Sequence, residues 1–247
     1  MKIALCLSGQ PRGIPLCLSF IQNNIIKPNN ISDVFFHAWH NEKDVGKFYN
    51  SAQSNQNGFV GLVKPNTEDT LVNTLKPKLF LVEPQRDFLH LRNLIQEPSA
   101  NQEFLGSNFF SVWSANELKR QYEQEQGFLY DCVIRTRYDL FYNAPIKVKD
   151  YQEKITGDNI VLMERFQNDQ DSKNNSNQPM VDIFAFGSSK VMDVFSSVYP
   201  NMVELNKQIS PRFGENYLGQ HIRVNNKIAL HKAPFEFQIM HRVLKNI

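Results

Sequence analysis

One short segment near the middle of the chain constrains the fold more than any other. Residues 132–134 form an apolar run, as in a buried strand, and Arg135, Arg137 and Asp139 follow it. Open α/β sheets bind their ligands at the carboxyl ends of strands. Guanidinium groups suit a diphosphate and a carboxylate suits a divalent cation. The segment therefore predicts a charged ligand site at a sheet edge; the alternative is a local ion pair at the end of a strand.

The order of the elements predicts an α/β fold. In the first half, strands are expected at residues 3–7, 34–39, 78–83 and 131–135, with helices at 14–24, 67–75 and 108–126. In the second half, strands are expected at 160–162, 182–187 and 227–232, with helices at 189–198 and 214–225. This alternation predicts a doubly wound, Rossmann-like mixed sheet flanked by helices. Because no linker or repeat divides the chain, a single domain over residues 1–247 is expected.

The turn after the first predicted strand is a candidate nucleotide site. Gly9 lets backbone amides approach a ligand, and the side chains of Ser8, Gln10 and Arg12 can donate hydrogen bonds. The turn is neither a Walker loop nor a G-x-G-x-x-G fingerprint. A plain tight turn is the alternative.

Composition and charge limit the compartment and the partners. Hydrophobic residues make up 41% of the chain and charged residues 21%, which is typical of soluble globular proteins. A net charge of +2 gives no electrostatic reason to expect nucleic acid. The first apolar run is too short for a signal peptide, and no stretch approaches the ~20 apolar residues of a transmembrane segment. The three cysteines lack metal-ligand spacing, so reduced thiols and a cytoplasmic protein are expected.

The sequence predicts different roles for His37 and His231. His37 alternates with Phe35 and Trp39 on one face of a predicted strand, which favours a hydrogen-bonded core histidine over a metal ligand. His231 is placed at the end of the last predicted strand, which could return to the ligand edge of the sheet. His231 is therefore a candidate metal ligand beside Asp139.

Two carboxylates in the second half are candidate catalytic groups. Asp182 opens a predicted strand and Glu215 begins a predicted helix, so either could act as a general base or hold acceptor hydroxyls. For Glu215, the alternative is an acid that complements the helix dipole. The polar segment 168–179 before Asp182 is predicted to be a mobile lid that orders on ligand binding. A solvated insertion without a role is its alternative.

An ordered series of blocks resembles a known family. The blocks are SGQPR, FFHAW, the helix FFSVWSANELKRQYEQEQGFLYD running into VIRTRYDL, then DIFAFGSS and GENYLGQHI. The series is similar to bacterial and giant-virus sugar transferases with a GT-A fold, including lipopolysaccharide-synthesis proteins of the WavE type. It covers most of the chain outside residues 41–63 and 168–179. The helix and the R-T-R-Y-D sequence are its most specific parts.

The resemblance implies a GT-A-like glycosyltransferase that moves a hexosyl or pentosyl group from a nucleotide-sugar to a glycan hydroxyl. A UDP- or GDP-sugar is the leading candidate for the donor. The resemblance also implies a nucleotide-sugar-binding half at residues 1–143 and an acceptor-binding half at 144–247, in the host cytoplasm if the source is viral. Together with the residue patterns above, it makes Glu215 and Asp182 the candidate catalytic residues, and Asp139 and His231 the candidate ligands for Mn²⁺ or Mg²⁺. The implied donor-binding residues are Ser8, Gly9, Gln10, Arg12, Ser111, Arg135 and Arg137.

The chain departs from the family pattern at one position. Asp139 occupies the place of the last aspartate in the D-x-D metal motif, but Arg137 stands where the first would be. The cationic pair Arg135 and Arg137 can then neutralise part of the diphosphate charge by itself. Two alternatives remain. The first is a nucleotidyltransferase, which would normally carry a lysine after its glycine-rich loop; residues 8–13 lack one. The second is a non-catalytic nucleotide-sugar or glycan-binding module.

Overall fold

A computed structural model gives the structure of the chain and describes residues 1–49, 61–94, 102–155, 159–163, 180–209, 214–233 and 237–239. The lid predicted at residues 168–179 lies outside these ranges. No helix in the described part is long and apolar enough to cross a membrane.

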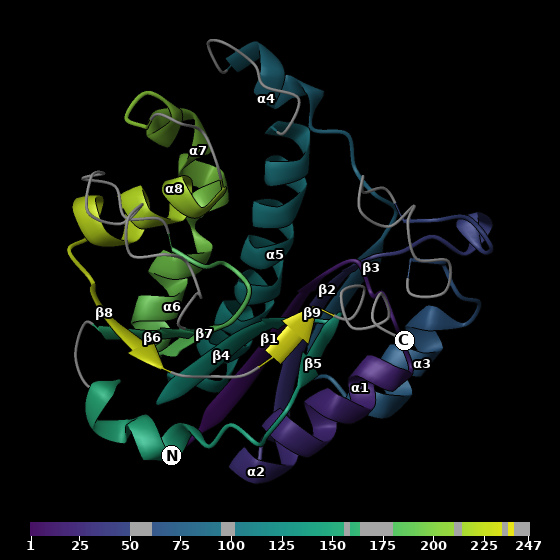
Figure 1. Cartoon of the computed structure of the whole chain (residues 1–247), viewed down its shortest axis with the longest axis horizontal. Coiled ribbons are helices and arrows are strands. Elements are labelled where there is room, and N and C mark those ends of the chain that lie inside the picture. Colours follow the sequence, from purple (N-terminus) through teal and green to yellow (C-terminus); the bar gives the residue numbers. More distant parts are fainter. Residues whose placement is uncertain are drawn as a thin grey trace.

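A seven-stranded mixed sheet forms the centre of the fold (Figure 1), with strand order β3-β2-β1-β4-β7-β6-β8. Its strands are β1 (Ile3–Gly9), β2 (Asp33–Trp39), β3 (Leu79–Glu83), β4 (Cys132–Arg137), β6 (Asn159–Met163), β7 (Ala185–Gly187) and β8 (Ala229–Ala233). Strand β7 runs antiparallel to both of its neighbours, whereas the other paired strands of this sheet are parallel. The predicted mixed sheet flanked by helices is confirmed.

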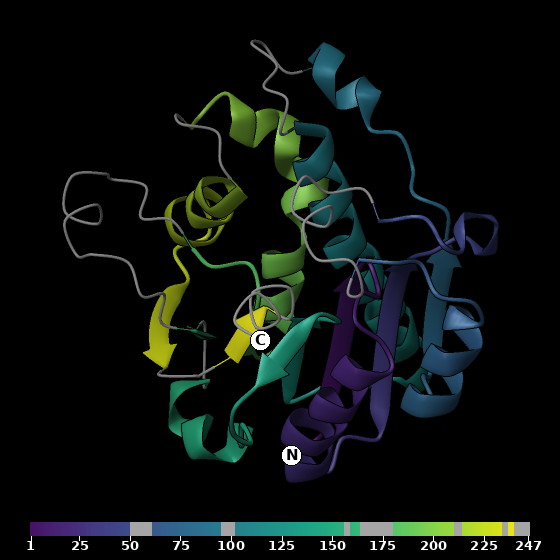
Figure 2. The same cartoon turned by 45° about the vertical axis from the view of Figure 1, so that its right-hand side comes forward.

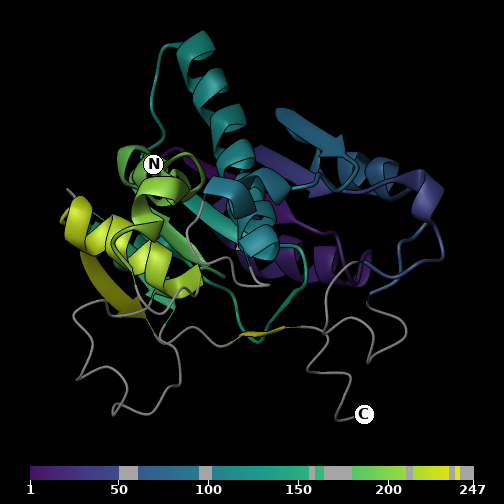
Figure 3. The same cartoon turned by 90° about the horizontal axis from the view of Figure 1, so that it is seen from above.

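Helices cover both faces of the sheet (Figures 1 and 2). The first face packs against α5 (Gln102–Gln126), α6 (Ser189–Ser196), α7 (Val198–Asn206) and α8 (Gly214–Gly219). The second face packs against α1 (Leu16–Ile21), η1 (Gln22–Ile26) and α3 (Thr67–Leu75). Strand side chains alternate between the two cores: Ala4 and Cys6 join the first core, and Leu5 and Leu7 join the second. Figure 3 views the same layers from above.

The longest helix, α5, positions much of the site described below. It begins at Gln102, earlier than the predicted start, and ends before Gly127, whose φ of 69° provides the left-handed helix stop that the sequence predicts. The helix packs along β1 and β2 and leads into β4. Its amino-terminal half therefore lies beside the carboxyl ends of these parallel strands.

A second, two-stranded sheet was not predicted. Strand β5 (Leu140–Tyr142) pairs antiparallel with β9 (Phe237–Ile239), so the last described segment returns to the residues that follow Asp139. The shorter elements α2 (Lys27–Asn29), η2 (Glu42–Asp44), α4 (Leu89–Leu94), η4 (Val148–Lys154) and η5 (Gln220–Asn225) complete the described structure.

Candidate active site

The arginine-rich segment lies at the topological switch point of the sheet. From β1 the chain proceeds to β2 and β3 on one side, and then crosses back to β4 on the other side of β1. Ser8 at the end of β1 is in register with Arg137 at the end of β4. Because open α/β sheets bind ligands in the crevice at such a point, the loop after β1 and the residues after β4 meet where a ligand is expected.

Asp139 is the shared counter-ion of two arginines. Arg137 donates from Nε and Nη2 to the two carboxylate oxygens of Asp139, at 2.8 and 2.7 Å. Nη1 of Arg12 lies 3.8 Å from Asp139 Oδ2, and Asp139 is buried. Burial alone would lower the pKa of Arg137, but the Asp139 carboxylate raises it above its ordinary value. The local ion pair that the sequence left as an alternative is therefore present, and it is part of a larger charged cluster.

Arg135 is buried with incomplete pairing. Its side chain is within β4 and only 2% of the residue is exposed. Nη2 donates to Ser8 Oγ at 3.3 Å, whereas Nε and Nη1 have no hydrogen-bond partner among the described residues. Burial lowers the pKa of Arg135 to about 10, although the charges of Asp182 and Asp139 oppose this fall. The site thus contains a desolvated positive charge with two buried donors that have no partner among the described residues.

The loop after β1 adds further polar groups at the same end of the sheet. Gly9 has a φ of 111°, a conformation that favours glycine. The Gln10 side-chain oxygen accepts a hydrogen bond from Arg12 Nη2, and Arg12 Nε has no partner in the described part of the chain. Arg12 is buried, and burial lowers its pKa. The loop is therefore a structured edge of the site that presents a second incompletely paired guanidinium.

Ser111 lies beneath this loop. The Ser111 side chain, on α5, is fully buried, and its hydroxyl oxygen accepts a hydrogen bond from the Gly9 N–H at 2.7 Å. The same hydroxyl lies 2.7 Å from His37 Nδ1. Ser111 is therefore connected to the site through the backbone amide of Gly9. The sequence prediction counted Ser111 among the donor-binding residues and identified His37 as a core histidine, but it missed their connection.

The structure brings the two candidate bases to neighbouring segments. Strand β7 is antiparallel to β4, with Ala185 opposite Arg135, so Asp182 just before β7 lies at the carboxyl end of β4. Asn108 of α5 donates to Asp182 Oδ2 at 2.7 Å. Glu215 at the start of α8 reaches this region through its backbone, because its carbonyl accepts from the Met180 N–H at 3.0 Å.

His231 is not brought to Asp139. It is the third residue of β8 rather than its last, and it pairs with Val161 of β6. Strands β7 and β6 separate β8 from β4, which places the two backbones roughly 14 Å apart at the usual strand spacing. The sequence placed this histidine near the end of a strand over residues 227–232, but β8 continues to Ala233.

The described residues do not fit the predicted Mn²⁺ or Mg²⁺ ion. Both oxygens of Asp139 already accept from Arg137, and the positive charges of Arg137 and Arg12 beside them oppose the binding of a cation. No group of three His, Cys, Asp or Glu side chains that could hold a metal ion occurs in the described ranges. The cluster of Arg12, Arg135 and Arg137 favours an anion over a cation.

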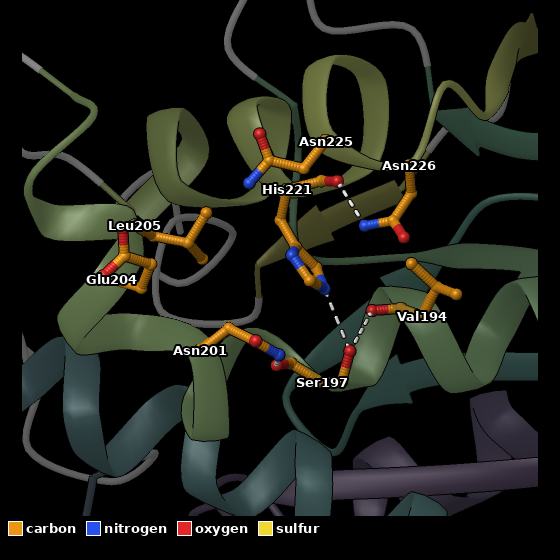
Figure 4. Close-up of a pocket in the computed structure, with 8 residues that line it drawn as sticks. All are labelled: Val194, Ser197, Asn201, Glu204, Leu205, His221, Asn225 and Asn226. Atoms are coloured by element: carbon orange, nitrogen blue, oxygen red, sulfur yellow. Dashed lines mark hydrogen bonds between the residues drawn. The ribbon is translucent and has the colours of Figure 1, made fainter.

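A separate polar cavity of about 350 Å³ lies on the helices of the second half (Figure 4). His221 Nε2 is 2.9 Å from Ser197 Oγ, and that hydroxyl donates to the Val194 carbonyl at 2.9 Å. Because the single hydroxyl proton goes to the carbonyl, His221 does not act as a base towards Ser197. The cavity is lined by Val194, Ser197, Asn201, Glu204, Leu205, His221, Asn225 and Asn226.

Residues 1–157, more than half of the 247, match the family described as "Domain of unknown function (DUF7796)". The chain belongs to this family. The DUF7796 match contains the loop after β1 and the segment from Arg135 to Asp139, and it ends before Asp182 and Glu215. No curated protein matches the sequence.

Two solved structures are similar to this DUF7796 protein. Mouse xyloside xylosyltransferase 1 in its apo form is 9% identical, with a TM-score of 0.45 and coverage of 94% of this chain and 84% of that one. The galactosyltransferase LgtC, in complex with donor and acceptor sugar analogues, is 11% identical, with a TM-score of 0.44 and coverage of 94% and 73%. Scores this low give no support to a functional assignment, which depends on the site itself.

Proposed function

We propose that this DUF7796 protein is a glycosyltransferase that moves a sugar from a nucleotide-sugar to a hydroxyl of a glycan acceptor. A UDP- or GDP-sugar is the leading candidate for the donor. The observation that carries the proposal is the buried guanidinium of Arg135, which lies at the switch point with Nε and Nη1 lacking partners among the described residues. A buried charge without full pairing is costly. An anionic ligand that accepts from both nitrogens would remove that cost.

A diphosphate fits the arrangement better than a single phosphate. Three guanidiniums converge from two segments, with Arg12 on the loop after β1 and Arg135 and Arg137 on β4. Asp139 balances part of this charge and also pairs with Arg12 and Arg137, which fixes their directions. The remaining positive charge suits the two linked phosphates of a nucleotide-sugar, and the polar groups of Ser8 and Gln10 suit its ribose or base.

The proposed chemistry uses these groups in the step that breaks the donor. The bond between the anomeric carbon and the diphosphate oxygen breaks, and its electron pair stays on the leaving nucleoside diphosphate. Arg12, Arg135 and Arg137 stabilise that growing charge, which is the largest contribution expected in such a reaction. The acceptor oxygen forms the new bond to the anomeric carbon, and its proton passes to a carboxylate if the reaction inverts, with Asp182 or Glu215 as the candidates.

A panel of nucleotide-sugars tests the proposal. A donor that binds the folded state raises the melting temperature, so one or more of the UDP-, GDP-, CMP- and dTDP-sugars should stabilise the protein. The stabilising donor should then be hydrolysed slowly, because water can replace the acceptor, and should release its nucleotide: a nucleoside diphosphate from a UDP-, GDP- or dTDP-sugar, or CMP from a CMP-sugar. Stabilisation without release of that nucleotide would support the non-catalytic binding module. Stabilisation by a nucleoside triphosphate with release of pyrophosphate would support the nucleotidyltransferase alternative.

A further inference from the structure

A buried chain of hydrogen bonds connects the edge strand β3 to the loop after β1. Glu83 Oε1 lies 3.0 Å from His37 Nε2, and His37 Nδ1 lies 2.7 Å from Ser111 Oγ. Ser111 Oγ in turn lies 2.7 Å from the Gly9 nitrogen. The chain thus passes through β3, β2 and α5 before it reaches β1.

The chemistry of each member sets the direction of every bond. The Glu83 carboxylate can only accept, so His37 Nε2 carries the ring proton and donates it there. In the neutral ring Nδ1 is then unprotonated and accepts from the Ser111 hydroxyl, whose oxygen accepts the Gly9 N–H. Burial lowers the pKa of His37, although the Glu83 carboxylate opposes this effect, so the ring is kept neutral as this arrangement requires.

The inner members of this hydrogen-bond chain are closed to solvent, and its outer end at Glu83 is held by Arg86. Both Ser111 and His37 are fully buried, so water does not compete for their bonds. Arg86 donates from Nε and Nη2 to Glu83 Oε2, at 2.9 and 2.7 Å. The His37 ring packs edge-on against Trp39, with centroids 4.4 Å apart. These contacts give His37 one orientation.

The acid, histidine and serine have the order of a hydrolytic triad, but Ser111 is not a nucleophile. Its oxygen is fully buried and accepts the Gly9 N–H. What the chain controls is the position of Gly9. The neighbours of Gly9 are Ser8, which accepts from Arg135, and Gln10, which accepts from Arg12. A shift at Gly9 therefore moves two groups that orient the arginines.

We propose that His37 and Ser111 are positioning residues that hold the loop after β1 in the conformation that binds the nucleoside diphosphate part of the donor. This inference rests on the proposed function, because it assumes that the switch point binds that ligand. Neither residue touches the ligand. Their effect passes through the Gly9 amide.

Ser111→Ala, with UDP and GDP as probes, is the first test. The substitution removes the acceptor for the Gly9 N–H, so the dissociation constant of the diphosphate that binds is expected to rise about tenfold, or about 1.4 kcal/mol, which is the worth of one buried hydrogen bond. Ser114→Ala, three residues further along α5 and also buried, is the matched control and should leave affinity unchanged. Amide hydrogen exchange should become faster at Gly9 in Ser111→Ala and stay slow in Ser114→Ala.

Two substitutions at His37 separate positioning from general damage to the core. His37→Asn retains an acceptor near the place of Nδ1 and should preserve most of the affinity and the slow exchange at Gly9. His37→Leu lacks that acceptor and should bind as weakly as Ser111→Ala. This pair also decides the matter if Ser111→Ala does not fold.

The outcomes distinguish this inference from the proposed function. Wild-type protein that binds neither UDP nor GDP, nor any other nucleoside diphosphate, would overturn the proposed function and the positioning role together. Wild-type binding that is equal in Ser111→Ala, or equally weak in His37→Asn and His37→Leu, would overturn only the positioning role.

Discussion

Replacement of Arg135 by methionine is expected to stabilise the fold while it abolishes nucleotide binding. Burial lowers the pKa of Arg135 to about 10, and one pKa unit corresponds to about 1.4 kcal/mol. The charged form is therefore disfavoured in the folded protein by about 3 kcal/mol at neutral pH. Methionine fills a similar space without charge, and the bond that it removes, to Ser8 Oγ at 3.3 Å, is long. We expect the free energy of unfolding to rise by about 1–3 kcal/mol.

Urea unfolding at pH 7, followed by circular dichroism, measures the first effect, and calorimetric titration with UDP and GDP measures the second. Arg137→Met is the matched control, because Arg137 holds both oxygens of the buried Asp139. Removing that partner should lower the unfolding free energy by about 3 kcal/mol while also weakening binding. If Arg135→Met destabilised the protein as much as Arg137→Met, Arg135 would be a structural cation, and the reasoning from its missing partners would be refuted.

Three further predictions concern the rest of the molecule. Burial lowers the pKa of His37 and His221, so the unfolded state binds more protons than the folded state in mildly acidic solution. The free energy of unfolding should therefore fall as the pH drops below about 6.5, by up to about 1.4 kcal/mol per pH unit for each histidine. Urea midpoints that are equal at pH 7.5 and 5.5 would contradict this. Lys119 is fully buried between Glu123 and Asp193, at 2.9 and 2.7 Å. Lys119→Ala should therefore lower the free energy of unfolding in urea by about 3–5 kcal/mol. A smaller decrease than that of the surface control Lys207→Ala would argue against the network. Nucleoside diphosphate affinity should be the same in EDTA as with Mn²⁺, since the arginines supply the positive charge; binding only with the cation would refute that assignment.

The position of the charged residues at the end of a strand could be predicted from the sequence, because that position depends on local order. An apolar run followed by arginines places charge at a strand end, and parallel strands bring the ends of β1 and β4 together. The Arg137–Asp139 pair is two residues apart and was recognisable as an alternative. The strand end was misplaced by two residues, since the predicted strand ended at Arg135 whereas β4 continues to Arg137.

The features that sequence reasoning missed depend on distant segments. Strands β5 and β9 have three residues each and come from far-apart parts of the chain, so neither carries a periodic pattern that would reveal their pairing. The bond between His37 and Ser111 joins residues 74 positions apart, and a polar residue in an apolar strand gives no sign of its partner. His231 was selected from an expected strand end, but the position of β8 in the sheet is a tertiary property.

Asp182 is the better placed of the two candidate bases, because its charge acts on the arginines of the site. The charge of Asp182 acts on both Arg135 and Arg137, and Asn108 occupies one of its oxygens, whereas Glu215 touches the same region through its backbone carbonyl. We therefore expect Asp182→Asn to slow donor hydrolysis by about 10²–10⁴-fold, the usual contribution of a general base, and Glu215→Gln to change it little. The loss of a negative charge beside the arginines should at the same time leave UDP or GDP affinity equal or stronger. Rates and affinities are measured on the same preparations, with melting temperatures as the check on folding. If Asp182→Asn weakened diphosphate binding in proportion to the rate, Asp182 would serve to orient the arginines, and the base would have to be sought at Glu215.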